Sequence, residues 1–284
     1  MSSPADLGHA IGMTVALSWL DAEAATDELA GLGFTAVELH LAQLTPALPG
    51  AIASEAQAAA FGRMLSERGL VPSSLNAAGA PGFEPISASW EDAVDALAGQ
   101  LRIAHAIGAP RVICWDGRPA ASGETGGAPA RLVEAIVEAR RRSGLADPPA
   151  VSVELHPFTF ALACGLLQET ATALHAAKAG LCIDFCHFAV ALGAGFIEAL
   201  TPAVVEATNH IHLADSDCVT SELHFPLGEG VLDLGQLLSV FNRRPVSVAW
   251  DLFGWPAPRL AMRHGLDRYR QIVDAHAREL EVLS

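Results

Sequence analysis

Four polar residues stand in segments that otherwise consist of apolar and β-branched residues. Glu154 lies in VSVELH, Asp184 in LCIDFCH, His212 in HIHLAD and Asp251 in VSVAWDL, each near the C-terminal end of its segment. A buried carboxylate is costly unless it is paired or bound to a metal, although a salt bridge or a cap would explain any one of the four. Three carboxylates and one imidazole brought together predict one divalent ion, with Mn²⁺ preferred and Mg²⁺, Co²⁺ or Zn²⁺ as alternatives.

Two further histidines accompany these segments. His156 has the same parity as Glu154, which predicts that it orients a ligand or substrate or forms a structural hydrogen bond. His187 follows Asp184 by three residues, at the junction of strand and loop, where it would touch substrate.

Glu38 and His210 have the same strand parity as the polar residues above, so they are expected to face the same side. Glu38 lies near the end of its strand, and His210 lies deeper. Glu38, in AVELH, is predicted either to contact substrate or to form a structural pair. His210 lies deeper than His212, which favours a core or supporting role. Three tryptophans follow or end strands, and each would either form an apolar surface against a sugar ring or pack in the core. These are Trp19, Trp115 and Trp255.

The elements that must position these residues follow a regular rhythm. Short β-rich segments start at residues 11, 36, 71, 111, 151, 181, 210 and 246, separated by Ala-, Leu- and Glu-rich stretches of helical character. Eight such units with no linker predict an α/β fold with a single (β/α)₈ TIM-barrel domain over residues 1–284. A doubly wound sheet is the alternative, but no GxGxxG follows the first strand. Barrel chemistry lies at the C-terminal mouth, so the four polar residues would line one half of it.

Residues typical of helix ends lie between these segments and support the alternation of strands and helices. Ser54 and Gln57 resemble a helix capping box. Glycines that precede strands are expected to end helices in the left-handed conformation, and these are Gly33, Gly69, Gly108 and Gly180.

The amino-acid composition of the chain limits which binding partners are expected. The chain of 284 residues has 17 Lys and Arg against 32 Asp and Glu, a net charge of −15 that disfavours nucleic acid and anionic membranes. The longest apolar run, 188–197, is ten residues, well short of the ~18–20 that span a bilayer. No secretion signal opens the chain, and five cysteines without a CxxC pair predict reduced thiols in the cytoplasm. A small carbohydrate-like substrate is expected, and homo-oligomerisation is left open.

Four motifs carry a family resemblance. VELHP at 153–157, DFCH at 184–187, HIHLAD at 210–215 and PLGEG at 226–230 resemble the xylose isomerase-like TIM-barrel superfamily, in its sugar phosphate isomerase/epimerase-like branch. That branch includes hydroxypyruvate isomerase, ketose epimerases and inosose dehydratase. The resemblance implies that Glu154, Asp184, His212 and Asp251 are the metal ligands. The family usually has Glu at the last position, so Asp251 is one methylene shorter.

The resemblance also implies a reaction. Carboxylates at the positions of Glu154 and Asp251 move a proton between adjacent carbons, while the metal polarises the substrate carbonyl and hydroxyl. His187 would contact substrate oxygens. The loop at 215–230 usually carries an Arg for substrate, but here Glu222 and His224 stand in it. His224 is therefore expected to bind substrate. The predicted function is a metal-dependent isomerase or epimerase of a small sugar, polyol-derived ketose or keto acid.

Three alternatives stay open. A dehydratase of a keto-cyclitol or dehydroshikimate-like substrate is favoured by Asp251, because an incomplete pair of bases also serves elimination. An endonuclease IV-like hydrolase would need histidines in the third and fourth strands, where VPSSLNA and RVICWDG have none. A non-catalytic barrel is the third alternative. In addition, Arg118 and Arg259 lie beyond strand ends, where they could hold a substrate carboxylate.

Overall fold

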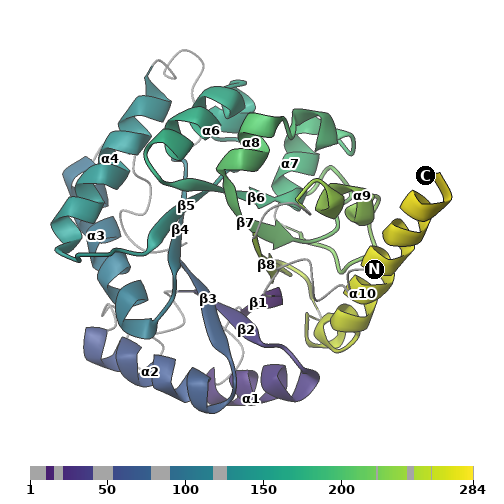
Figure 1. Cartoon of the computed structure of the whole chain (residues 1–284), viewed down its shortest axis with the longest axis horizontal. Helices are drawn as coiled ribbons and strands as arrows, with labels where there is room; N and C mark the ends of the chain where they lie inside the picture. The colour runs from purple at the N-terminus through teal and green to yellow at the C-terminus, as the bar shows by residue number, and fades with distance from the viewer. Residues whose placement is uncertain are drawn as a thin grey trace.

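In a computed structural model of the chain, eight parallel strands form a closed barrel surrounded by helices (Figure 1). The structure describes residues 11–15, 22–40, 54–77, 90–117, 127–221, 223–241, 246–256 and 258–283. The strands are β1 (Ile11–Val15), β2 (Ala36–His40), β3 (Val71–Asn76), β4 (Arg111–Trp115), β5 (Ala150–Glu154), β6 (Gly180–Asp184), β7 (Thr208–Leu213) and β8 (Ser247–Trp250). Each strand pairs with the next, and β1 pairs with β8 to close the barrel. The predicted (β/α)₈ barrel is confirmed, and all eight strands start within two residues of the predicted positions.

The helices lie outside the barrel (Figure 1). They are α1 (Ala22–Leu32), α2 (Glu55–Glu67), α3 (Trp90–Ile107), α4 (Ala128–Ser143), α5 (Phe160–Ala163), α6 (Leu167–Ala176), α7 (Phe185–Leu192), α8 (Pro202–Ala207), α9 (Leu234–Ser239) and α10 (Pro258–Leu283), with the 3₁₀ turn η4 (Phe196–Ala199). The predicted capping box starts α2. The hydroxyl of Ser54 accepts the Gln57 N–H at 3.2 Å, and Gln57 Oε1 accepts the Ser54 N–H at 3.0 Å.

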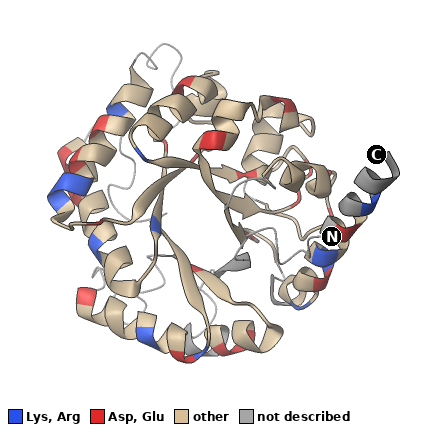
Figure 2. Ribbon diagram, viewed as in Figure 1, with Lys and Arg blue, Asp and Glu red and all other residues tan. Residues whose placement is uncertain are grey.

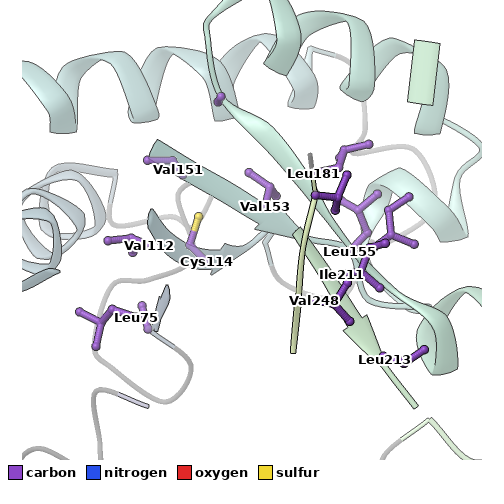
Figure 3. Close-up of a cluster of buried hydrophobic side chains, with 14 of the residues drawn as sticks. Leu75, Val112, Cys114, Val151, Val153, Leu155, Leu181, Ile211, Leu213 and Val248 are labelled. Atoms are coloured by element: carbon purple, nitrogen blue, oxygen red, sulfur yellow. The ribbon is translucent and has the colours of Figure 1, made fainter. Parts of the chain in front are cut away.

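Alternate residues of each strand face the helices or the barrel interior. On β7, Ile211 and Leu213 belong to the apolar cluster that also contains Val153 and Val248 (Figure 3). His210, of the opposite parity, instead reaches across the barrel: its Nε2 lies 2.8 Å from a carboxylate oxygen of Glu38 on β2. The interior of the barrel is therefore polar on this side, and it leads up to the C-terminal mouth.

The glycine prediction holds at three of four positions. Gly33, Gly69 and Gly108 have positive φ. Gly180 does not, and the left-handed residue before β6 is Lys178, with φ of 57°. Gly180 is required for another reason, because a Cβ there would lie 2.3 Å from the side chain of Asn209 on the neighbouring strand.

Charged residues are spread over the outer helices. Figure 2 shows acidic and basic residues interspersed on these helices in this view, without a continuous basic face. None of the helices in the described part of the chain is both long and apolar enough to cross a membrane.

Candidate metal centre

The four predicted ligands lie together at the C-terminal mouth. Glu154 ends β5, Asp184 ends β6, His212 is next to last in β7, and Asp251 directly follows β8. One ligand atom from each lies within 4.8 Å of the others. Nδ1 of His212 is 2.9, 3.6 and 3.9 Å from the nearest carboxylate oxygens of Glu154, Asp184 and Asp251. Ligands bound to one ion at ~2.1 Å lie up to ~4.2 Å apart, so these three spacings suit a single ion.

A helix start orients Asp184. The residue is the N-cap of α7, and its Oδ1 accepts the backbone N–H of His187 at 2.9 Å. The other oxygen, Oδ2, is buried and accepts no hydrogen bond. An unpartnered buried carboxylate oxygen beside two other carboxylates is the arrangement expected of a metal ligand. The donor set and this orphaned oxygen fit a divalent ion.

Glu38 contacts His212 on the side that faces away from the other three predicted ligands. Nε2 of His212 lies 3.0 Å from Glu38 Oε1, so that Nδ1 faces the other three ligands. Glu38 also accepts hydrogen bonds from Ser74 at 2.5 Å and from Asn76 at 3.3 Å. Its exposed fraction is zero. Of the two roles expected for Glu38, this position suits structural pairing, because the carboxylate is enclosed beneath His212.

The charges of the buried carboxylates favour a cation among the four predicted ligands. Burial raises the pKa of Glu154, but His212 outweighs it and lowers that pKa to about 2. Burial likewise opposes ionisation of Asp184, yet the surrounding histidines hold its pKa well below the usual range. Although burial disfavours a charged imidazole, the negative groups around His212, Glu38 among them, raise its pKa well above 6.5. A protonated His212 thus supplies the positive charge that a divalent ion would supply instead.

The predicted substrate residues form one wall of the mouth. The ring centroids of Trp115 and His156 are 4.0 Å apart, and those of His156 and His187 are 4.1 Å apart. His224 continues the row, 5.4 Å from His187. All three histidines are buried, and Trp115 is half-buried. Burial, with the adjacent His187 as a second cause, lowers the pKa of His156 to about 3, so this imidazole is neutral.

The loop after β7 fixes His224. The carboxylate of Asp215 accepts backbone N–H groups from Ser216, Gly228 and Leu232 at 2.9–3.0 Å. The N–H of His224 donates to the carbonyl of Phe253 at 2.9 Å. These bonds fold the PLGEG loop back over the mouth and bring His224 Nδ1 to 3.2 Å from Asp251 Oδ2. Burial disfavours its charged form, but Asp184 and Asp251 raise the pKa of His224 well above its usual value.

Sequence reasoning did not single out Asp116. It directly follows β4, is fully buried, and accepts hydrogen bonds from the Thr159 hydroxyl at 2.5 Å and the Ala161 N–H at 3.2 Å. The backbone N–H of Thr159 in turn donates to the carbonyl of His156 at 3.2 Å, so Asp116 anchors the segment that carries His156. Burial raises the pKa of Asp116 to about 7. Its place directly after a strand, the same signal that marked Asp251, would have found it.

The remaining predicted residues are Trp255 and four that the structure does not fully describe. Trp255 packs against Phe225, with ring centroids 5.4 Å apart. Trp19, Arg118 and Glu222 lie outside the described residues, as does the side chain of Arg259.

The family model of the xylose isomerase-like TIM barrel matches residues 26–272. The chain belongs to this family. Both the predicted family and the predicted fold are thereby confirmed. No curated protein has a matching sequence.

Solved structures with the same fold include proteins of different activity. Endonuclease IV from Thermus thermophilus is 22% identical, with a TM-score of 0.68 over 94% of this chain and 99% of that one. A D-tagatose 3-epimerase-like protein is 15% identical, with a TM-score of 0.70 over 94% and 99%. IOLI protein with a bound zinc atom is also 15% identical, with a TM-score of 0.68 over 94% and 99%. At such low sequence identities, structural similarity shows only that the fold is shared.

Proposed function

We propose that the protein is a divalent-metal-dependent isomerase or epimerase of a small sugar, ketose or keto acid. The observation that carries the proposal is the convergence of Glu154, Asp184, His212 and Asp251 at the barrel mouth, with ligand atoms within 4.8 Å of one another. Among solved structures of the same fold, one is of a D-tagatose 3-epimerase-like protein and another holds a zinc atom, which supports both halves of the proposal.

The four residues would hold the ion. Three carboxylates and one imidazole form an oxygen-rich set, for which Mn²⁺ is our preference among divalent ions. When bound, such an ion polarises a substrate carbonyl and stabilises negative charge on the adjacent oxygens. Nδ1 of His212 would serve as a ligand in its unprotonated form, while Nε2–H would donate to Glu38.

In this proposal, Glu154 and Asp251 move the proton. They come from β5 and β8, and both carboxylates border the Nδ1 side of His212, at 2.9 and 3.9 Å. We take Glu154, which is ionised at neutral pH, as the group that accepts a proton from a substrate carbon. The other carboxylate returns a proton to the neighbouring carbon or to the opposite face. A positioned acid or base of this kind contributes roughly 10²–10⁴-fold.

Substrate would lie against the row of rings. His187 and His156 have ring nitrogens without hydrogen-bond partners, which can serve substrate hydroxyls. Trp115 closes the row with an apolar face that suits the C–H side of a sugar. The partner we propose is therefore a small carbohydrate-like molecule. The five cysteines, all free, suit the cytoplasm.

The contact between His224 and Asp251 favours a second candidate, a dehydratase. Their 3.2 Å separation, together with the raised pKa of His224, makes His224 a proton donor. In that reaction Glu154 removes a proton from carbon, the C–O bond to the β-hydroxyl breaks, and His224 protonates the departing hydroxyl to give water.

Incubation of candidate substrates in D₂O, followed by NMR, tests the proposal. Ketoses, keto acids and keto-cyclitols would be supplied to the Mn²⁺-loaded protein. An isomerase or epimerase introduces solvent deuterium at a carbon that keeps its hydroxyl. A dehydratase yields an unsaturated product and water. Neither change with any member of the panel, in protein shown to hold the ion, would contradict the proposal.

A further inference from the structure

An arginine enters the barrel from the end opposite the proposed metal site. Arg111 is the first residue of β4, and its guanidinium reaches β7 and β8, which lie three and four strands away in the closed barrel. Its Nη1 donates to the carbonyl of Asn209 at 2.9 Å, lies 3.1 Å from Nδ1 of His210, and contacts the hydroxyl of Ser247. One side chain therefore ties three strands together around His210.

The contact with Arg111 determines which nitrogen of His210 carries a proton. A guanidinium has donors only, so Nδ1 of His210 must accept at this contact and carries no hydrogen. The hydroxyl of Ser247 agrees with this assignment, because it can accept from Arg111 and donate its own hydrogen to Nδ1. His210 is therefore a neutral imidazole with its single proton on Nε2.

This proton sets the direction of the next hydrogen bond. Nε2 of His210 lies 2.8 Å from Oε2 of Glu38, so His210 donates to the carboxylate. Ser74 also donates to Oε2, at 2.5 Å, and Asn76 donates to Oε1 at 3.3 Å. Glu38 accepts from all three partners, and its carboxylate, which has no exposed surface, is held in one orientation.

The same carboxylate orients His212. Nε2 of His212 donates to Oε1 of Glu38 at 3.0 Å, which leaves Nδ1 on the side of the three carboxylates at the mouth. If His210 carried its proton on Nδ1 instead, its Nε2 lone pair would face Oε2 of Glu38, and two acceptors would repel each other. The hydrogen bonds that orient His212 therefore depend on the proton position that Arg111 imposes.

The charge of Arg111 favours the same arrangement. Glu38 is fully buried, and a buried carboxylate is costly unless positive charge or hydrogen bonds compensate for it. The guanidinium is always charged, and one imidazole separates it from Glu38. It therefore supplies positive charge to Glu38 while an unprotonated Nδ1 of His212 serves as a ligand.

We propose that Arg111 is a positioning residue for the metal centre and acts on His212 through His210 and Glu38. It touches neither the ion nor the substrate. Its guanidinium, which can only donate, sets the direction of the hydrogen bonds that end at Nε2 of His212. The inference rests on the four-residue metal site of the proposed function, and it applies to either candidate reaction.

The proton on His210 can be observed by NMR. Metal-free full-length protein labelled with ¹⁵N-histidine distinguishes protonated from unprotonated ring nitrogens, and the signals that disappear in His210→Phe identify this residue. We expect a protonated Nε2 and an unprotonated Nδ1 in the wild type. A proton on Nδ1, or on both nitrogens, overturns the proposal. Because this measurement uses the wild type, it decides the question even if no variant of Arg111 folds.

Mn²⁺ affinity shows whether the effect of Arg111 reaches the metal site. In calorimetric titrations Arg111→Met, which removes the donors and the charge, should bind Mn²⁺ ~10-fold more weakly, the lower end of the effect of groups that orient a ligand. Arg111→Lys keeps a donor and the charge, so it should recover part of the loss. Arg140→Met on the outer helix α4 is the matched control, because Arg140 also donates to two backbone carbonyls, those of Ala177 and Lys178, at 2.8 Å. It should bind Mn²⁺ as the wild type does.

A double-mutant cycle tests the route through Glu38. If Arg111 acts through this carboxylate, Arg111→Met should change the Mn²⁺ affinity of a Glu38→Ala protein little further. Equal fold-losses with and without Glu38 would overturn the proposed route. Wild-type affinity in a folded Arg111→Met protein would overturn the positioning role itself.

Failure of this proposal can be told apart from failure of the proposed function. A wild type that binds no Mn²⁺ refutes the metal centre, and the role of Arg111 in it falls as well. A wild type that binds Mn²⁺, together with unchanged affinity in Arg111→Met, refutes only the positioning role.

Discussion

Oε1 of Glu38 lies 3.0 Å from Nε2 of His212, on the side of the imidazole opposite the proposed metal. A carboxylate in this place fixes the ring orientation and makes the imidazole a better ligand. We predict that Glu38→Ala weakens Mn²⁺ binding ~10–100-fold, and that Glu38→Gln, which keeps an acceptor oxygen, recovers part of the loss. Calorimetric titration measures both. If Glu38→Ala lowers the unfolding temperature but leaves Mn²⁺ affinity unchanged, Glu38 is only a structural residue.

Replacing His224 by Phe separates the two candidate reactions. In an isomerase, His224 contacts substrate without taking part in proton transfer, so His224→Phe should raise KM more than it lowers kcat. In a dehydratase the same variant loses the group that protonates the leaving hydroxyl, and kcat should fall ~10²-fold or more. Steady-state kinetics on the substrate found by NMR decides between them. We expect the first outcome.

Asp116 makes stability depend on pH. Burial raises its pKa in the folded protein to about 7, above the ordinary value of 3.8. Between these values the folded state holds a proton that the unfolded state has lost, so the free energy of unfolding falls as pH rises, by at most ~1.4 kcal/mol per pH unit. The unfolding free energy of the wild type minus that of Asp116→Asn should therefore fall from about pH 4 to about pH 7 and then level off. Denaturant titrations across this range measure it, and a difference that is constant with pH would show that Asp116 is not protonated in the fold.

Two helical glycines should respond oppositely to alanine. A Cβ on Gly62 in α2 would lie 2.3 Å from the carbonyl oxygen of Ile107, a backbone atom that cannot move aside. On Gly99 in α3 the nearest atom is 3.7 Å away, at the end of the Arg102 side chain. Gly99→Ala should stabilise the protein by ~0.5–1 kcal/mol through helix propensity, whereas Gly62→Ala should destabilise it by ~1–3 kcal/mol. Urea denaturation of the pair tests how closely α2 packs against the end of α3, and equal effects would contradict that packing.

The likeness to endonuclease IV leads to a negative prediction. The third and fourth strands, VPSSLN and RVICW, bring no histidine to the mouth, and acidic residues outnumber basic ones by 32 to 17. We expect no incision of a duplex that contains an abasic site, with or without Zn²⁺. Metal-dependent cleavage that disappears in Asp184→Ala would show instead that this chain acts on DNA.

Strand parity explains why much of the site could be predicted from sequence. In a strand buried on both faces, a charged residue near the C-terminal end has few explanations, and that rule located Glu154, Asp184 and Asp251. Parity does not give depth, so Glu38 was indistinguishable from a substrate residue until the barrel placed it beneath His212. Gly180 shows the same limit. Its position before a strand suggested a left-handed turn, but the close approach of Asn209 from the adjacent strand is what requires glycine there.

Asp184→Ala tests the central claim most directly. Elemental mass spectrometry would count Mn²⁺ in wild type and variant, each purified without chelator and again after reconstitution. The four-residue site predicts about one tightly held Mn²⁺ per wild-type chain and its loss from Asp184→Ala with the fold retained. A wild-type protein that binds no Mn²⁺ after reconstitution, or a variant that holds it as tightly as wild type, would contradict the claim that Glu154, Asp184, His212 and Asp251 form a metal centre.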